Sequence, residues 1–221
     1  MTKPLKNVIL EGSMLLLLLL LLPKPASAQL WNIFHTARVQ EPGDRRIGVA
    51  FDVDDEFDFF DLTGRFELGV MPNVEVDASG GLVFGDSGGD SLIGFQGGGA
   101  VIYQLIEDTK AVPLDVAAYG GLHLSLLFGD TDVTFLPIDL LLLLSKRLEL
   151  PNLNVEPYLG FGVDILYSKA SAGGFSESDT EGKFTLPFGL RGKITEKLDG
   201  MVELRFIGGD LTMGLFAAYT F

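Results

Sequence analysis

Two residues that could act as a base and a nucleophile stand two positions apart in an apolar stretch of the chain, at His123 and Ser125. Side chains two positions apart lie on the same face of a β-strand, and a turn centred near residue 131 would bring Asp139 close to His123. A hydroxyl, an imidazole and a carboxylate within hydrogen-bond reach are the parts of an activated nucleophile. His123, Ser125 and Asp139 are therefore candidate residues of a hydrolase.

A second serine lies in the string Gly85-Asp86-Ser87-Gly88-Gly89. This string resembles the nucleophile motif of trypsin-like serine proteases, and His35, Asp52 and Ser87 occur in the order of that family's triad. The usual context of the histidine is missing, and a triad needs geometry rather than order. Glycine, aspartate and serine are also the usual residues of turns, so we interpret the string as a loop between two strands.

The pair His123 and Ser125 looks like the pair in outer-membrane lipid A deacylases, which in that family faces outward to reach an acyl chain. Here the surrounding alternation turns the pair inward, and the rest of the family motif is absent. We therefore expect no enzyme, with a lipid-modifying hydrolase as the alternative. The chain has no cysteine and no His/Asp/Glu cluster with metal-ligand spacing, so we expect neither a metal nor a cofactor.

The elements that would position these residues are strands with a two-residue period. Ile47, Val49, Phe51 and Val53 share one face of the first strand, and small or acidic residues share the other. Similar alternation recurs along residues 46–221, and no segment there is apolar for long enough to span a membrane as a helix. This pattern predicts an all-β chain: a single antiparallel transmembrane β-barrel of about ten strands, with eight or twelve as alternatives.

The last strand has aromatic residues at its end. Apolar residues alternate from Leu211 to Tyr219 and Phe221, which resembles the C-terminal strand of bacterial outer-membrane β-barrel proteins, with Phe216 where the commoner form has glycine. The resemblance implies that Tyr219 and Phe221 are an assembly signal, read by the barrel-assembly machinery. A strand at the very end of a chain leaves an edge exposed, so we expect it to pair with the first strand.

The start of the chain has the pattern of a secretory signal peptide. Lys3 and Lys6 precede the apolar run Met14 to Leu22, and a small-residue cleavage site follows at Ala26-Ser27-Ala28. We expect cleavage after Ala28, so that residues 1–28 are removed. Residues 29–45 have little periodicity and are predicted to be a periplasmic lead-in segment or a short inner strand, and residues 46–221 the barrel in the outer membrane.

The connections between the predicted strands differ in length. Short ones fall at Met71–Asn73, Glu107–Val112, Pro151–Asn154 and Thr195–Gly200, which an even strand count places on the same side as both termini. The longest, Ser171–Lys183, falls on the opposite side. Short periplasmic turns and longer outer loops are typical of bacterial barrels.

If the apolar faces meet lipid, the opposite faces form a lumen lined with charge. The expected lumen network is Asp52, Asp54, Arg65, Glu67, Glu75, Asp77, Asp115, Asp139, Glu156, Asp164, Arg191, Lys193, Glu203 and Arg205. Charge in a narrow lumen must be paired or hydrated. A barrel of about ten strands is little wider than one that side chains fill, so the network predicts either a polar plug or a narrow path that favours cations.

The charge of the chain excludes nucleic-acid binding as its function. The chain has 16 basic and 30 acidic residues and no basic run, so it is not a nucleic-acid binder. We expect a structural barrel or a narrow porin-like path for small solutes, with an adhesin or receptor barrel as a further alternative that would need longer outer loops. The implied partners are outer-membrane lipids, lipopolysaccharide, the barrel-assembly machinery and periplasmic chaperones; solute and oligomeric state stay open.

Overall fold

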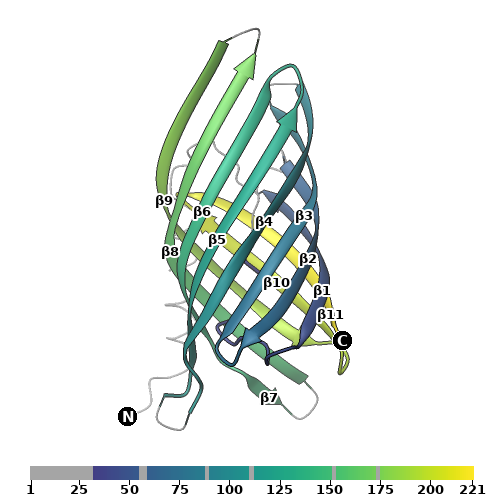
Figure 1. Cartoon of the computed structure of the whole chain (residues 1–221), viewed down its shortest axis with the longest axis vertical. Helices are drawn as coiled ribbons and strands as arrows, with labels where there is room; N and C mark the ends of the chain where they lie inside the picture. The colour runs from purple at the N-terminus through teal and green to yellow at the C-terminus, as the bar shows by residue number, and fades with distance from the viewer. Residues whose placement is uncertain (1–31, 55–58, 88–89, 110–111, 151–152, 173–174) are drawn as a thin grey trace, which may run out of the picture.

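The chain folds into one closed barrel. The computed structural model describes residues 32–54, 59–87, 90–109, 112–150, 153–172 and 175–221, and ten antiparallel strands of this part form the barrel wall (Figure 1). The strands are β1 (Arg45–Asp54), β2 (Phe59–Met71), β3 (Val74–Ser87), β4 (Asp90–Ile106), β5 (Asp115–Phe128), β6 (Asp132–Ser145), β7 (Leu148–Leu150), β8 (Leu153–Ala172), β9 (Phe175–Lys193), β10 (Leu198–Ile207) and β11 (Asp210–Thr220). The predicted fold class is confirmed.

Closure takes place at two seams. The first strand β1 lies between β2 and β11, with Ile47 opposite Tyr219 and Asp54 opposite Thr212. At the second seam β6 pairs with β8 from Tyr158 to Ser171, and the short β7 pairs with Leu153–Val155 along the same edge of β8, so it extends the line of β6. Each wall strand therefore has a neighbour on both sides, which removes the exposed edges that make open sheets aggregate. The expected pairing of the last strand with the first is confirmed.

The wall is apolar outside and polar inside. On β1, Ile47 and Val49 are both 55% exposed, whereas Asp52 on the opposite face is 4% exposed. This is the reverse of a water-soluble sheet, and it follows from the two-residue period of the sequence once the ring closes. An apolar belt around a charged interior is the pattern of a barrel that spans a membrane. In the described part of the chain, no helix is long and apolar enough to cross one.

Two strand boundaries differ from the prediction. The segment Ser171–Lys183 was expected to be the longest loop, but it belongs mostly to a paired hairpin in which Ser168 lies opposite Asp179 and Ser171 opposite Ser176. Backbone hydrogen bonds hold such a hairpin together even when its side chains are polar, so β8 and β9 extend farther than their neighbours (Figure 1). The sixth strand, for which alternation predicts the bounds Val133–Leu148, ends at Ser145 in the structure, and β7 follows it.

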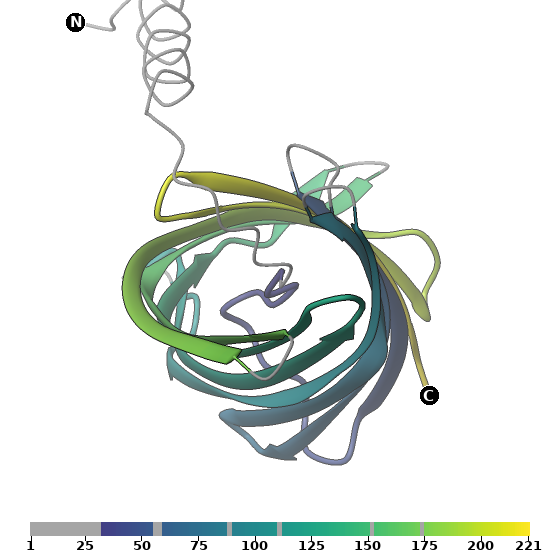
Figure 2. The same ribbon diagram turned by 90° about the horizontal axis from the view of Figure 1, so that it is seen from above.

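The lead-in segment lies inside the barrel. Residues 32–40 were expected to belong to a periplasmic lead-in over 29–45, but the structure places them in the lumen, enclosed by the ring of strands (Figure 2). Residues 32–37 are all buried, and Phe34 is 0% exposed. We call residues 32–40 the plug. The expected signal peptide, its cleavage site and residues 29–31 lie outside the described residues.

Candidate functional site: a plugged lumen

Side chains of the barrel wall satisfy the backbone of the plug. The carboxylate of Glu203 on β10 accepts hydrogen bonds from the backbone N–H of Ile33 at 2.5 Å and of Phe34 at 2.8 Å. From the other side, Arg65 on β2 donates to the backbone carbonyls of Ile33 at 2.6 Å and Asn32 at 3.3 Å. A backbone without regular structure is tolerated at membrane depth only when protein groups bond it in this way.

Three further strands also bond the plug. Ser145 on β6 accepts from the backbone N–H of Ala37 at 3.2 Å, and Glu75 on β3 accepts from that of Gln40 at 2.8 Å. The side chain of Asn32, at the deep end, bonds Asp52 on β1 at 2.5 Å. The wall therefore forms hydrogen bonds with both ends of the plug, so the plug is an ordered part of the fold.

Apolar contacts of the plug point in opposite directions. Ile33 belongs to a buried cluster with Ala100, Ile102, Ala117, Tyr119, Leu141 and Leu143 on β4–β6, while Phe34 packs with residues of β1, β8, β10 and β11. The ring of Phe34 stacks on Phe216 with 5.5 Å between centroids, and the guanidinium of Arg65 lies 5.5 Å from the Phe216 centroid. The inward-facing ring of Phe216 thus serves as a platform for the plug.

A glycine makes room for this contact. Gly214 faces inward on β11, directly opposite Asp52 in the register, and a Cβ atom built there would collide with Asp52 Oδ1, Phe34 Cζ and Asn32 Nδ2. Two of these three neighbours belong to the plug. The absence of a side chain at Gly214 is therefore a condition for the plug to sit where it does.

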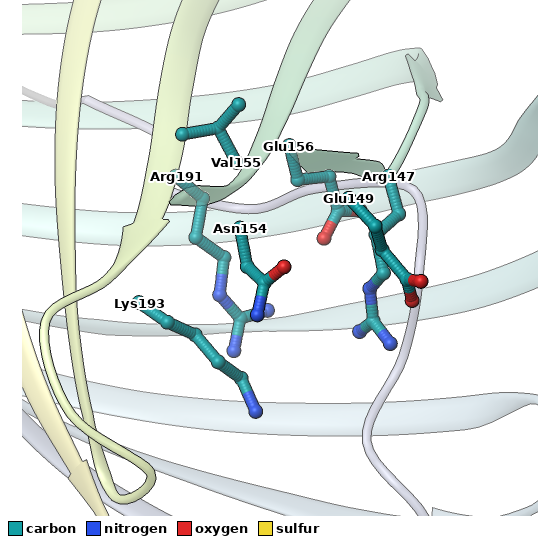
Figure 3. A pocket seen from close by; sticks show the side chains of 7 residues that line it. All are labelled: Arg147, Glu149, Asn154, Val155, Glu156, Arg191 and Lys193. Carbon is teal, nitrogen blue, oxygen red and sulfur yellow. The ribbon is translucent and has the colours of Figure 1, made fainter. Parts of the chain in front are cut away.

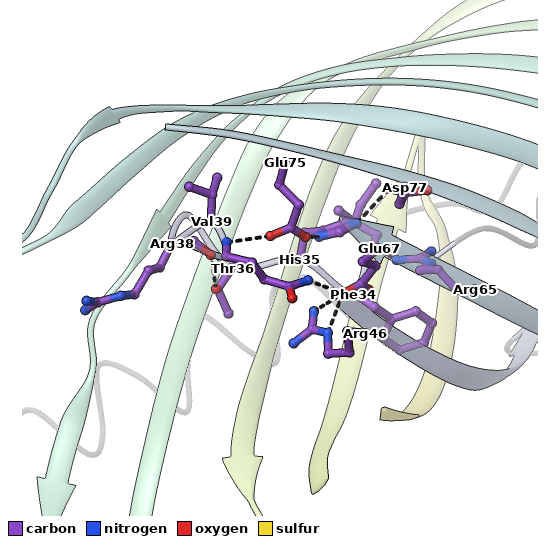
Figure 4. Close-up of polar contacts among 12 residues, drawn as sticks. Phe34, His35, Thr36, Arg38, Val39, Arg46, Arg65, Glu67, Glu75 and Asp77 are labelled. Atoms are coloured by element: carbon purple, nitrogen blue, oxygen red, sulfur yellow. Dashed lines mark hydrogen bonds and ion pairs between the residues drawn. The ribbon is translucent and has the colours of Figure 1, made fainter. Parts of the chain in front are cut away.

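His35 joins the plug to two carboxylates of β3 (Figure 4). Its Nε2 lies 2.8 Å from Asp77 Oδ2, and its Nδ1 lies 3.4 Å from Glu75 Oε1. Burial by itself lowers the pKa of His35, but the adjacent carboxylates of Asp77 and Glu75 outweigh it and raise the pKa to about 9. At neutral pH the imidazole ring of His35 is therefore a cation between two carboxylates.

A second buried ion cluster centres on Arg205 of β10, which is 0% exposed. Arg205 donates to Thr185 at 2.9 Å and to Asp164 at 3.1 Å, and it forms an ion pair with Asp139. Asp139 and Asp164 are register partners on β6 and β8, so the seam between these strands places two carboxylates side by side. One arginine shared by both offsets their mutual repulsion.

The mouth of the barrel on the side of Phe221 is lined by charged side chains. A pocket of about 180 Å³ lies there, lined by the basic residues Arg147, Arg191 and Lys193 and by the acidic residues Glu149 and Glu156 (Figure 3). Arg191 forms an ion pair with Asp199, which also pairs with Arg46. The mouth thus carries charges of both signs, whereas acidic residues predominate in the interior.

Most predicted lumen residues lie where alternation placed them. Those buried inside the barrel are Asp52, Asp54, Arg65, Glu67, Glu75, Asp77, Asp115, Asp139, Glu156, Asp164, Glu203 and Arg205. Arg191 is half-buried at the mouth and Lys193 is exposed there, because both lie at the end of β9 where the lumen opens. Arg46, Asp61 and Asp199 are also buried, and the same two-residue period would have found them.

The candidate catalytic residues are buried in the lumen. His123 Nε2 lies 3.9 Å from Asp139 Oδ2, and Ser125 on the same strand is 4% exposed. The inward orientation that alternation predicted is the one observed. For the protease-like string, the ring of His35 bonds Asp77 and Asp52 bonds Asn32, so His35 and Asp52 have other partners, and Ser87 ends β3 as a strand residue.

Comparison with known proteins gives similarity of fold. No family model and no curated protein matches the sequence. Solved structures that resemble the chain include bacterial outer-membrane barrels and a designed transmembrane β-barrel. The N-terminal barrel domain of Pseudomonas aeruginosa OprF is 13% identical, with 82% of this chain and 100% of that one covered and a TM-score of 0.42. The translocator domain of the Neisseria meningitidis autotransporter NalP is 12% identical, with 82% and 90% covered and a TM-score of 0.46.

Proposed function

We propose that this chain is a non-enzymatic outer-membrane barrel that is closed at rest by its own plug and forms a narrow path for small solutes when the plug leaves. The observation that carries the proposal is the position of residues 32–40, which occupy the lumen and are hydrogen-bonded to the wall. A barrel built only as a solid structural element would not need a separate chain segment to fill it. The apolar exterior supports the placement in a membrane.

The interior favours cations as the solutes of such a path. Carboxylates outnumber the buried arginines Arg46, Arg65 and Arg205. A cluster of apolar side chains lies at the end of the lumen away from Phe221 and consists of Val83, Leu92 and Leu127 on β3, β4 and β5. The half-buried apolar residues packed against it lie on β2 and β6, so the cluster covers one side of the ring. Once the plug leaves, we therefore expect a passage lined with negative charge, which selects cations over anions.

Removing the plug should open the barrel. We expect the full mature chain to give no steady current in a planar bilayer, and a variant lacking residues 32–40 to give discrete conductance steps with a preference for K⁺ over Cl⁻. The physical reason is that the deletion replaces a bonded segment with water while leaving all wall strands intact. Single-channel recording with a salt gradient measures both conductance and selectivity.

The matched control keeps the length and the backbone of the lead-in but removes its side-chain contacts, by replacing residues 32–40 with a glycine–serine segment of equal length. This control should conduct like the deletion, because it lacks the contacts of Asn32, Phe34 and His35 with the wall, and a flexible segment loses more conformational entropy when it is held in place. Steady conductance of the unaltered chain, or a deletion variant that is correctly folded and still closed, would overturn the proposed path.

Deleting Phe221 should reduce assembly in cells far more than stability in vitro. The side chain is 57% exposed on the barrel surface, and its backbone N–H bonds the carbonyl of Arg45 at 3.1 Å, so the folded barrel loses little. The resemblance of the last strand to outer-membrane proteins motivates its role as the signal for the assembly machinery. The measurement compares the amount of the deletion variant in the outer membrane with the urea unfolding of the same variant refolded in vitro.

The control variant replaces Phe221 with tryptophan, so its chain keeps an aromatic last residue. If the deletion variant reached the outer membrane in the same amount as the wild type, the role assigned to Phe221 would be contradicted.

The inward position of His123, Ser125 and Asp139 supports a non-enzymatic protein. All three are buried within the ring of strands, where a lipid acyl chain outside the wall has no access. Asp139 is moreover engaged by Arg205. A buried polar cluster that is held by ion pairs serves the stability of the barrel instead of chemistry on a lipid.

A further inference from the structure

The fold brings one plug residue and two wall residues into a compact cluster. His35 on the plug, Glu67 on β2 and Glu75 on β3 each place one nitrogen or oxygen atom so that all three lie within 4.8 Å of one another. All three residues are buried, and Figure 4 shows them converging from the plug and the two strands. An imidazole and two carboxylates are a common ligand set for a transition-metal ion.

Two oxygen atoms in this cluster lack hydrogen bonds. Within the part of the chain that the structure describes, Glu67 Oε1 and Glu75 Oε1 are buried without a hydrogen-bond partner. The other oxygen of each carboxylate is engaged: Glu67 Oε2 accepts from Arg46, and Glu75 Oε2 accepts from the backbone N–H of Gln40 at 2.8 Å. A buried carboxylate oxygen left without a donor is costly, so Glu67 Oε1 is available for a further cation, and Glu75 Oε1 has only the ring of His35 near it, at 3.4 Å.

The ring of His35 is oriented as metal-binding histidines usually are. Its Nε2 is held by Asp77 Oδ2 at 2.8 Å, which leaves Nδ1 directed at Glu75 Oε1 at 3.4 Å. Histidines that bind a metal through one ring nitrogen commonly donate the other N–H to a carboxylate, which fixes the tautomer. The spacing of 3.4 Å is also that of two ligand atoms around a tetrahedral zinc ion, for which metal–ligand distances of about 2.1 Å apply.

We propose that His35, Glu67 and Glu75 form a binding site for a divalent transition-metal ion of the Zn²⁺ class, with Asp77 as the residue that orients His35. The imidazole ligand favours Zn²⁺ over Ca²⁺ and Mg²⁺, which prefer oxygen ligands alone.

The site would tie the plug to the wall. His35 belongs to the plug, whereas Glu67 and Glu75 belong to neighbouring strands, so a bound ion adds coordination bonds between the two parts. A ligand that binds only this seated arrangement stabilises it by mass action. The site stands on its own geometry and does not require that the barrel conduct solutes.

Zn²⁺ binding to the refolded mature chain tests the proposal. A purification tag without histidine is used, because the sequence contains only two histidines, His35 and His123. Isothermal titration with ZnCl₂ should give about one bound ion per chain, and CaCl₂ at the same concentration should not compete. His35→Gln and Glu75→Gln should abolish this binding, and Asp77→Asn should weaken it by about 10- to 100-fold.

The matched control is His123→Gln, which removes the other buried histidine and should leave Zn²⁺ binding unchanged. Circular dichroism establishes that each variant is folded. Because a variant could fail to refold, a zinc X-ray absorption spectrum is recorded on the unaltered chain as well. A first shell with one imidazole nitrogen and carboxylate oxygens is expected; a shell of oxygen alone, no binding by the unaltered chain, or full binding by folded His35→Gln would overturn the proposal.

Discussion

Replacing Arg205 with methionine should destabilise the barrel by about 3–5 kcal/mol, the usual cost of removing one partner from a buried ion cluster. Arg205 is 0% exposed and is the cation shared by Asp139 and Asp164. These two aspartates are register partners at the seam where β6 meets β8, so the substitution removes their common counter-charge at the point where the ring closes. Methionine has a similar length and no charge, so the change tests charge more than volume.

Urea unfolding of the refolded protein in lipid vesicles at neutral pH measures this loss. The matched control adds Asp139→Asn and Asp164→Asn to Arg205→Met, which removes the repelling charges together with the cation. The triple variant should regain most of the lost free energy of unfolding, because neutral amides need no counter-charge. A single variant within about 1 kcal/mol of wild type would contradict the role assigned to Arg205, since a surface substitution has an effect of that size or less.

Replacing Gly214 with valine should unseat the plug while leaving the wall closed. A side chain there would collide with Phe34 and Asn32 of the plug and with Asp52 of β1. Overpacking of this kind costs about 1–3 kcal/mol, which shifts the equilibrium between seated and released plug by roughly ten- to hundred-fold. The plug is the part that yields, because hydrogen bonds to two neighbouring strands hold the backbone of β11 in place.

Labelling of a cysteine in the plug measures this release. The chain has no cysteine, so Thr36→Cys introduces a single thiol at a position that is 4% exposed. Its reaction with a water-soluble maleimide should be slow in the parent and roughly ten- to hundred-fold faster with Gly214→Val. Gly64→Val is the control, since a Cβ at Gly64 would lie 3.7 Å from its nearest neighbour. Equal labelling rates in all three proteins would show that Gly214 does not control the seat of the plug.

Local patterns in the sequence were sufficient for the wall. Alternation along β1 placed Ile47, Val49 and Phe51 outside and Asp52 inside, and all four lie there. This works because successive side chains of any strand point to opposite faces, whatever the strand pairs with. The aromatic ending and the even strand count likewise anticipated that β11 pairs with β1. Strand ends were less certain: the polar stretch 171–183 looked like a loop because side-chain polarity carries no information about backbone pairing.

Only the tertiary structure decided what fills the barrel. Residues 32–40 have no periodicity, and their partners are remote in sequence: Glu203 lies 170 residues from Ile33 and Ser145 lies 108 residues from Ala37. An irregular segment has no hydrogen-bonding pattern of its own, so its place depends on donors and acceptors that exist only once the ring has closed. The cluster of His35, Glu67 and Glu75 arises in the same way, because no spacing along the chain announces a site assembled from a plug and two wall strands.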